Sequence, residues 1–282
     1  TFKVITPMFM AGQNQKEAEF RIPSLLGVLR FWYRATAPQQ SIADLRKAEA
    51  ELFGSTNRQS SILISCIQEN VQKVTGKKHN WGQSTGIGYL GYGPITYSKK
   101  DSGNFVRSHL KEGGFLKINF LFRPKGNQDV EGLKRTIKAL GLFGGLGSRS
   151  RRGFGSVTLV SLKDELGNNY WQPPRSREEL QSEISSFIAS LELNARALEP
   201  SYTAFSPRSR VVISETYQSC FEVLENIGRE MIRYRSYGRG EEHKLPWSEK
   251  AEKNFSFDHD LLLSFGKTDI NSHPRRVAFG LP

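Results

Sequence analysis

A stretch rich in glycine and arginine, Gly145–Gly155, constrains the fold of this chain more than any other feature. No acidic residue lies between Leu142 and Leu162. The stretch contains Gly145, Gly147, Arg149, Arg151, Arg152, Gly153 and Gly155. Glycine permits positive φ, successive N–H groups in such turns form concave anion sites, and arginine binds phosphate through a planar fork of donors. The stretch predicts a loop that lies against a polyanion; the alternative is a flexible, solvated basic loop.

The residues on either side of this loop predict that it joins a helix to a strand. An apolar stripe at helical spacing precedes it, with Asp129 as the expected N-cap and Gly141 as the expected end. The stripe consists of Val130, Leu133, Ile137 and Leu140. Residues 156–160 follow the loop and are rich in β-branched side chains, which favours a strand. Dinucleotide fingerprints and P-loops run from strand to helix instead, so we expect no nucleotide cofactor.

The charge of the chain also points to a polyanionic partner. Its 282 residues include 40 Lys and Arg against 28 Asp and Glu, a formal net charge of +12. Such a surplus is typical of proteins that bind nucleic acid and, less often, anionic membranes. No apolar run approaches the roughly 18 residues that cross a bilayer. Cys66 and Cys220 form neither a disulfide framework nor a metal-ligand pair, so we expect a cytoplasmic protein without metal, membrane partner or small-molecule substrate.

The N-terminal part contains a basic amphipathic helix, expected over 24–37 with Pro23 in its first turn. Its wide apolar arc includes Trp32 and Tyr33, for which core packing is the favoured interpretation. Residues 20–43 contain three arginines and no acid: Arg21, Arg30 and Arg34. Arg30 and Arg34 share a strip with Gly27, where a second chain could approach the helix backbone. Without acidic partners they are either RNA contacts or an ordinary solvated face.

A second basic cluster ends a helix expected over 217–234. It interleaves arginines with aromatic side chains: Arg229, Arg233, Tyr234, Arg235, Tyr237 and Arg239. Arginine between aromatics can pair with phosphates and stack on bases. Basic residues are equally favoured at helix C-termini by the macrodipole. Arg233 and Arg235 are therefore candidate RNA contacts, and both interpretations stay open.

The order of elements predicts an α+β fold. We expect strands at 2–6, 60–67, 115–122 and 156–160, and helices at 24–37, 41–53 and 129–141, with an exposed loop at 68–84. This is the ferredoxin-like order. A linker at 167–177 and a polar helix at 178–197 follow. Strands at 210–213 and 276–279 around the helix at 217–234 indicate a second, incomplete α+β unit.

The segment Arg152–Leu159 overlaps the aromatic strand motif of RNA-recognition domains. Ser156 and Leu159 stand where that motif has aromatic residues. A base-stacking platform is therefore not expected here, and recognition of RNA by shape and phosphate contact is the more natural inference.

Several short motifs resemble one family. The spacing Gly-x-Gly-x5-Gly-x-Gly before the last strand of a ferredoxin-like unit resembles the glycine-rich loop of the RAMP proteins of CRISPR systems. Further motifs resemble the first-numbered RAMP subunit of the type III-B Cmr complex: Ile5–Phe9, Arg21–Ser24, Leu29–Arg34, Glu51–Gly54 and Phe279–Pro282, the last directly after Arg275 and Arg276. They are spread from end to end and are specific only together. Arg21, Arg275 and Arg276 lie in or beside these motifs and are further candidate RNA contacts.

The resemblance implies two ferredoxin-like (RRM-like, βαββαβ) domains with a glycine-rich loop. We expect an N-terminal domain at 1–165, a linker and helix at 166–200, and a second domain at 201–282. Family members continue beyond the last motif, so we expect either that the second domain lacks its last strand or that the sequence is trimmed here. The implied function is that of a non-catalytic subunit in antiviral defence, which contacts guide RNA near its 3′ end and/or target RNA, with other Cmr subunits as partners.

Two alternatives remain open. Some RAMP relatives cleave guide precursors by general acid–base chemistry, usually with histidine, and His109 and His79 are the least poor candidates for a metal-independent endoribonuclease. No histidine shows the spacing of a metal site or a triad. In the second alternative, the glycine-rich loop mainly docks a neighbouring subunit.

Overall fold

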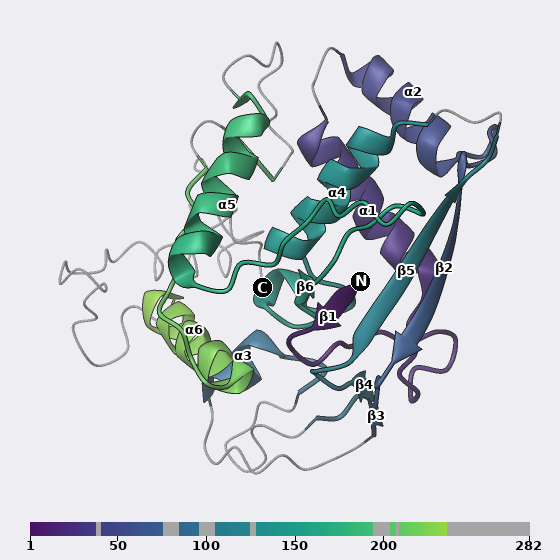
Figure 1. Cartoon of the computed structure of the whole chain (residues 1–282). Helices are drawn as coiled ribbons and strands as arrows, with labels where there is room; N and C mark the ends of the chain where they lie inside the picture. Colours follow the sequence, from purple (N-terminus) through teal and green to yellow (C-terminus); the bar gives the residue numbers. More distant parts are fainter. Residues whose placement is uncertain are drawn as a thin grey trace, which may run out of the picture.

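A computed structural model describes residues 1–37, 41–75, 85–95, 105–124, 128–193, 204–206 and 209–235. A four-stranded sheet lies at its centre, in the order β2-β5-β1-β6, and each pair of neighbours is antiparallel (Figure 1). The strands are β1 (Phe2–Val4), β2 (Ile62–Glu69), β5 (Phe115–Phe122) and β6 (Val157–Leu159). All four strands expected in the first 160 residues are confirmed, and every strand end lies within two residues of its expected position.

The register of the sheet places β1 at its centre. Phe2 pairs with Leu116 of β5 on one side and with Leu159 of β6 on the other. The β2–β5 pair is the longest and runs from Ile62 opposite Phe122 to Glu69 opposite Phe115. A second sheet of two short strands, β3 (Lys73–Val74) and β4 (His109–Leu110), was not expected, and β3 lies inside the predicted loop at 68–84.

One face of the four-stranded sheet packs against α1 (Ile22–Thr36) and α4 (Val130–Phe143), as Figure 1 shows. The main core joins this face to the apolar stripes of the two helices, and α2 (Ile42–Phe53) adds Leu52 and Phe53. Trp32 and Tyr33 are buried in this core, so their predicted packing role is confirmed. The opposite face of the sheet leaves Leu63 and Leu121 exposed, which follows from the alternation of side chains along a strand.

Helix α4 begins as its sequence predicts and ends later. Asp129 is the N-cap, and its side chain accepts a hydrogen bond from the N–H of Gly132 at 2.9 Å. The expected end at Gly141 is wrong, because the helix continues to Phe143 with Gly144 as its C-cap. A Cβ on Gly141 would lie 2.5 Å from the Cβ of Leu159, so this glycine allows the helix to approach β6 closely.

Two helices follow the sheet, α5 (Arg177–Ser190) and α6 (Cys220–Arg235). Both were expected, although α5 ends before residue 197. Phe187 of α5 extends the main core by contact with Phe143, at a ring-centroid distance of 5.9 Å. The strand expected at 210–213 is wrong: these residues form no strand, and Val212 is 90% exposed. The strand expected at 276–279 lies outside the described residues.

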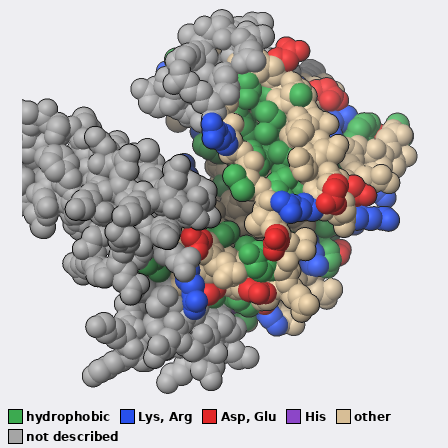
Figure 2. Space-filling view, turned by 90° about the vertical axis from the view of Figure 1, so that its left-hand side faces the viewer, with side chains coloured by type: hydrophobic (Ala, Val, Ile, Leu, Met, Phe, Trp, Pro, Cys, Tyr) green, Lys and Arg blue, Asp and Glu red, His purple; other side chains and the backbone are tan. Residues whose placement is uncertain are grey.

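Helix α6 packs against α3 (Thr85–Leu90), a short helix that the sequence did not reveal. Together they enclose a second, smaller hydrophobic cluster with Phe9, Phe105 and Phe154. On the described part of the face in Figure 2, basic and acidic side chains lie among apolar ones, without an extended patch of one sign. The surplus of positive charge is therefore not gathered on the described part of that face.

Candidate nucleic-acid interface

The glycine-rich loop joins α4 to β6, as the sequence predicts, and it is firmly anchored. Its apolar side chains point inward, so that Leu146 is 1% and Phe154 0% exposed. The N–H of Ser148 donates to the carbonyl of Phe9 at 2.8 Å, and the N–H of Gly155 donates to that of Pro7 at 2.9 Å. These contacts exclude the flexible, solvated loop that was the alternative. The burial of Phe154 also agrees with the expectation that the RRM-like motif offers no stacking platform here.

The backbone of the loop takes positive φ at four places. Gly147 and Gly153 have φ of 87° and Gly155 of 63°, and Arg149 lies in the same left-handed region at 63°. A Cβ on Gly155 would overlap the carbonyl oxygen of Leu146, so glycine is required there. An L-residue with a side chain in this region costs about 1–2 kcal/mol, which makes Arg149 an outlier.

The backbone N–H groups of the loop mostly turn toward the protein. The amide of Leu146 donates to Gly155 at 2.8 Å, and that of Arg152 to Arg149 at the same distance. The amide of Ser156 donates to the hydroxyl of Thr6 at 2.9 Å. The expected concave site of successive amides is therefore wrong for these positions, and the side chains are left to contact an anion.

Two of the three loop arginines lie against neighbouring helices, and Arg149 lies near Gly93, after the end of α3. The guanidinium of Arg151 lies 5.8 Å from the ring centroid of Phe31 in α1, and that of Arg152 lies 5.6 Å from the ring of Tyr89 in α3. A Cβ on Gly93 would lie 3.5 Å from Nη2 of Arg149. Within the described ranges, no carboxylate lies within 4.0 Å of any of the three guanidiniums. Their charge is available to an external anion.

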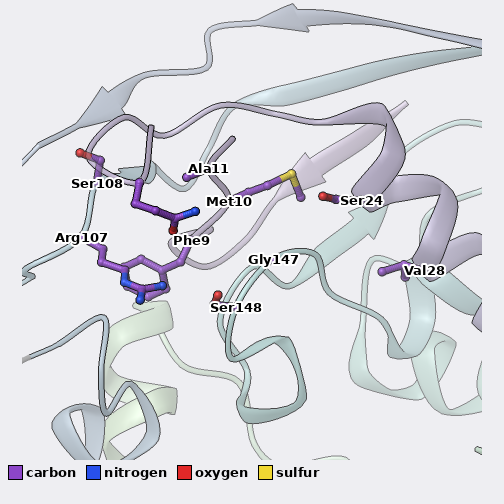
Figure 3. Close-up of a pocket in the computed structure, with 10 residues that line it drawn as sticks. Phe9, Met10, Ala11, Ser24, Val28, Arg107, Ser108, Gly147 and Ser148 are labelled. Carbon is purple, nitrogen blue, oxygen red and sulfur yellow. The ribbon is translucent and has the colours of Figure 1, made fainter. Parts of the chain in front are cut away.

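A surface pocket of about 400 Å³ opens beside the loop (Figure 3). Three separate segments and one helix contribute its lining: Phe9, Met10, Ala11, Gln15, Ser24, Val28, Arg107, Ser108, Gly147 and Ser148. Figure 3 shows Arg107 and Phe9 at one end and Val28 of α1 at the other. Sequence reasoning missed Arg107, because a single arginine outside any motif carries no local signal. Arg21, a predicted contact, lies beside the pocket through its N–H to Sδ of Met10 at 3.1 Å, and its side chain pairs with Glu19 at 3.4 Å.

Arg30 and Arg34 do have an acidic partner, contrary to the argument from the sequence. Glu49 of α2 accepts from Nη1 of Arg30 at 3.0 Å and from Nη1 of Arg34 at 2.8 Å. Arg30 also donates to the carbonyl of Phe53 at 2.8 Å. The two arginines therefore tie α1 to α2. Their predicted role in RNA binding stays a prediction, but the absence of acidic partners no longer supports it.

The other predicted contacts lie at the edge of what the structure describes. Arg233 and Arg235 belong to the last turn of α6, and Arg275 and Arg276 fall outside the described residues. The neighbouring Arg229 pairs with Glu225 within α6 at 2.6 Å. These RNA contacts remain predictions.

Of the two histidine candidates, the structure describes His109. His109 is 1% exposed, and its ring lies 4.2 Å from the centroid of Phe105 and 5.6 Å from that of Phe9. His79 is outside the described residues. In the described part of the chain, no group of three His, Cys, Asp or Glu side chains could hold a metal ion. No helix in that part is both long and apolar enough to cross a membrane.

Comparison with known proteins gives a consistent result. A model of the RAMP superfamily matches residues 1–158. The CRISPR system Cmr subunit Cmr1-2 of Pyrococcus furiosus is 28% identical over 180 residues, which are 58% of this chain and 95% of that protein. Cmr1-1 of the same organism is 26% identical over 151 residues, 52% of this chain and 43% of that protein. The crystal structure of Cmr1 from P. furiosus in its apo form has a similar fold, with a TM-score of 0.51 at 17% identity, over all of this chain and 75% of that one.

Proposed function

Since the chain belongs to the RAMP superfamily, we propose that it is a non-catalytic, RNA-binding subunit of a type III-B Cmr effector complex in antiviral defence. The likeness to Cmr1-2, a Cmr subunit matched over 95% of its length, supports this proposal. Its partners are then guide RNA near the 3′ end, target RNA and other Cmr subunits. The complex acts in the cytoplasm.

The proposal includes a ferredoxin-like N-terminal domain at 1–165. The chain order β1, α1, β2, β5, α4, β6, with β1 between β5 and β6, supports it. Helix α2, α3 and the small β3–β4 sheet are then insertions into the βαββαβ unit. We also propose the linker at 166–200 and a second ferredoxin-like domain at 201–282, to which α6 belongs.

One observation supports the RNA-binding proposal: within the described ranges the loop arginines form no ion pair, and the backbone that carries them is anchored. Arg149, Arg151 and Arg152 project from an anchored backbone and face no carboxylate in the described part of the chain. Guanidiniums fixed in this way can bind phosphates without first giving up an internal ion pair. The glycines at 145, 147, 153 and 155 set the shape of the loop, and Arg107 and Arg21 extend the basic rim.

The experiment compares two triple variants of equal charge. Replacing Arg149, Arg151 and Arg152 by alanine should weaken binding of all single-stranded RNAs alike. It should also flatten the salt dependence, by about 0.7 in slope for each phosphate that the protein no longer neutralises. The control replaces Lys47, Lys163 and Arg175, which are exposed and lie away from the loop. If both triple variants keep the affinity and slope of the parent, or lose them equally, the loop is not the RNA site.

The endonuclease alternative gains no support, because a general acid or base must reach its substrate and His109 is enclosed by aromatic rings. If the loop instead docks a neighbouring subunit, the expected result of a pull-down experiment differs. Partner subunits would then still be recovered with the chain after RNase treatment, and the triple loop variant would lose them.

A further inference from the structure

We propose that the pocket beside the glycine-rich loop receives one unstacked nucleobase of the RNA strand whose phosphates the loop arginines bind. This inference rests on the proposed function and adds to it a subsite for the base. The pocket is formed by residues far apart in the sequence, and it lies directly against the loop at Gly147 and Ser148.

The size and lining of the pocket suit a nucleobase. Its volume of about 400 Å³ lies within the range of about 300–1,000 Å³ that is usual for small-ligand sites. Met10 and Val28 provide apolar surface for the face of a base, while Ser24, Gln15 and Arg107 provide polar groups for its edge. A planar ring with a polar rim requires this combination of surfaces.

The polar groups around the pocket have hydrogen-bonding capacity left. Gln15 uses its Nε2 to donate to the carbonyl of Gly12 at 3.0 Å, which leaves Oε1 as an acceptor. The guanidinium of Arg107 is exposed and, within the described ranges, lies within 4.0 Å of no carboxylate. It can donate to a base edge or stack on a base face, as arginine does in RNA complexes. Ser148 is exposed, and its N–H already holds the carbonyl of Phe9, so its hydroxyl can turn to a ligand.

The phosphate contacts lie next to this pocket on both sides. Ser148 precedes Arg149 in the chain, so the two Cα atoms are about 3.8 Å apart. Val28 lines the pocket, and Phe31, one turn further along α1, carries the guanidinium of Arg151. A strand held at Arg149 and Arg151 would therefore run beside the mouth of the pocket.

This geometry requires single-stranded RNA at this point. A base in an A-form duplex is stacked and paired, and protein side chains reach it only poorly through the deep major groove. An unstacked base held against protein side chains is instead the usual mode of recognising loops and strand ends. The subsite thus selects a splayed nucleotide, for instance at the end of a guide–target pairing.

The test uses the full chain and two strands of equal length and charge, an oligoadenylate and a wholly abasic phosphodiester. The parent protein should bind the oligoadenylate about tenfold more tightly, since one stacked base contributes about that factor. Ser148→Trp fills the pocket and Arg107→Ala removes a donor from its rim. Both variants should lose the preference for bases. Ser148→Trp should still bind the abasic strand as the parent does, whereas Arg107→Ala, which also removes a charge from the basic rim, should bind both strands more weakly. Ser65→Trp, on the exposed face of β2, is the matched control and should keep the preference.

The outcomes separate this inference from the proposed function. If the parent binds both strands equally, or if both pocket variants keep the preference, the base subsite is rejected while RNA binding by the loop stands. If the parent binds neither strand, the proposed function itself fails. Arg107→Ala keeps the test decisive in case Ser148→Trp does not fold, which its thermal unfolding curve would show.

Discussion

Gly86 of α3 and Gly228 of α6 meet backbone to backbone where the two helices cross. A Cβ on Gly228 would overlap the carbonyl oxygen of Gly86, and a Cβ on Gly86 would overlap that of Glu225. The carboxylate of Glu225 also accepts a hydrogen bond from the N–H of Ile87 at 2.9 Å. The crossing holds Leu224 in the second hydrophobic cluster, which also contains Phe154 of the glycine-rich loop.

We therefore expect Gly228→Ala to lower the free energy of unfolding by about 1–3 kcal/mol, because an added methyl group overpacks the crossing. Gly27→Ala is the matched control in α1, where a Cβ would have no neighbour within 4 Å. This control should raise stability by about 0.5–1 kcal/mol, as alanine does in an exposed helix interior. Urea unfolding of both variants measures the difference. Equal shifts of the two variants would show that the crossing is not tight.

Arg149→Gly should separate stability from binding. Glycine adopts φ of 63° without strain, so this variant should be more stable by about 1 kcal/mol. It should bind RNA more weakly, because a guanidinium is removed from the loop. Unfolding curves and RNA titrations on the same preparation check both signs. A gain in stability with unchanged affinity would mean that Arg149 serves neither the loop nor the ligand.

Glu49→Ala should destabilise the chain by about 1–3 kcal/mol, because it leaves Arg30 and Arg34 without their shared acceptor. Glu165→Ala is the control, since Glu165 is exposed and forms no ion pair within the described ranges. A double-mutant cycle with Arg34→Ala measures the coupling. Arg34→Ala alone should affect unfolding more than RNA affinity; the reverse result would restore the predicted RNA role of this arginine.

At high pH, the free energy of unfolding should depend on the ionisation of the Tyr33 hydroxyl. Burial, and then the hydrogen bond from its hydroxyl to Asp129 at 2.8 Å, raise the pKa of Tyr33 above its ordinary value of 10. A raised pKa in the folded state means that this contribution is complete below pH 10 and is lost as pH rises through the folded pKa. Tyr33→Phe should cost about 1 kcal/mol at neutral pH and progressively less above pH 10. Unfolding curves taken across this range measure the effect, and Tyr92→Phe, at an exposed position, is the control, which should change the free energy of unfolding little at neutral pH.

Short-range sequence patterns were sufficient to predict the strands of the four-stranded sheet and most of the helices. Asp129 and the stripe behind it predict α4, and the alternation in 115–122 predicts β5, because both patterns act within a few residues. The prediction of a strand at 210–213 is wrong because it, too, used only short-range patterns. Its β-branched residues favour extended backbone, but a strand also needs a neighbouring strand, which the described structure does not provide.

The site was predicted only in part, because its remaining pieces come from distant segments. The loop arginines are visible in the sequence, whereas Phe31, Tyr89 and Arg107 gain their meaning only when the chain brings them beside the loop. Glu49 is the reverse case. It lies on α2, whereas Arg30 and Arg34 lie on α1. The charge pattern of α1 alone therefore indicated arginines without acidic partners, although both form ion pairs with Glu49.

The order in which the chain is made has a consequence for the support beneath Phe154. The glycine-rich loop leaves the ribosome well before α6, which carries Leu224 and closes the apolar cluster around that ring. In a nascent chain that ends before α6, the loop therefore lacks the packing that Leu224 adds to the cluster around Phe154. The loop therefore reaches its full packing only after α6 has been made, and truncation before Cys220 should yield a protein whose loop is loosened although every residue of the loop is present.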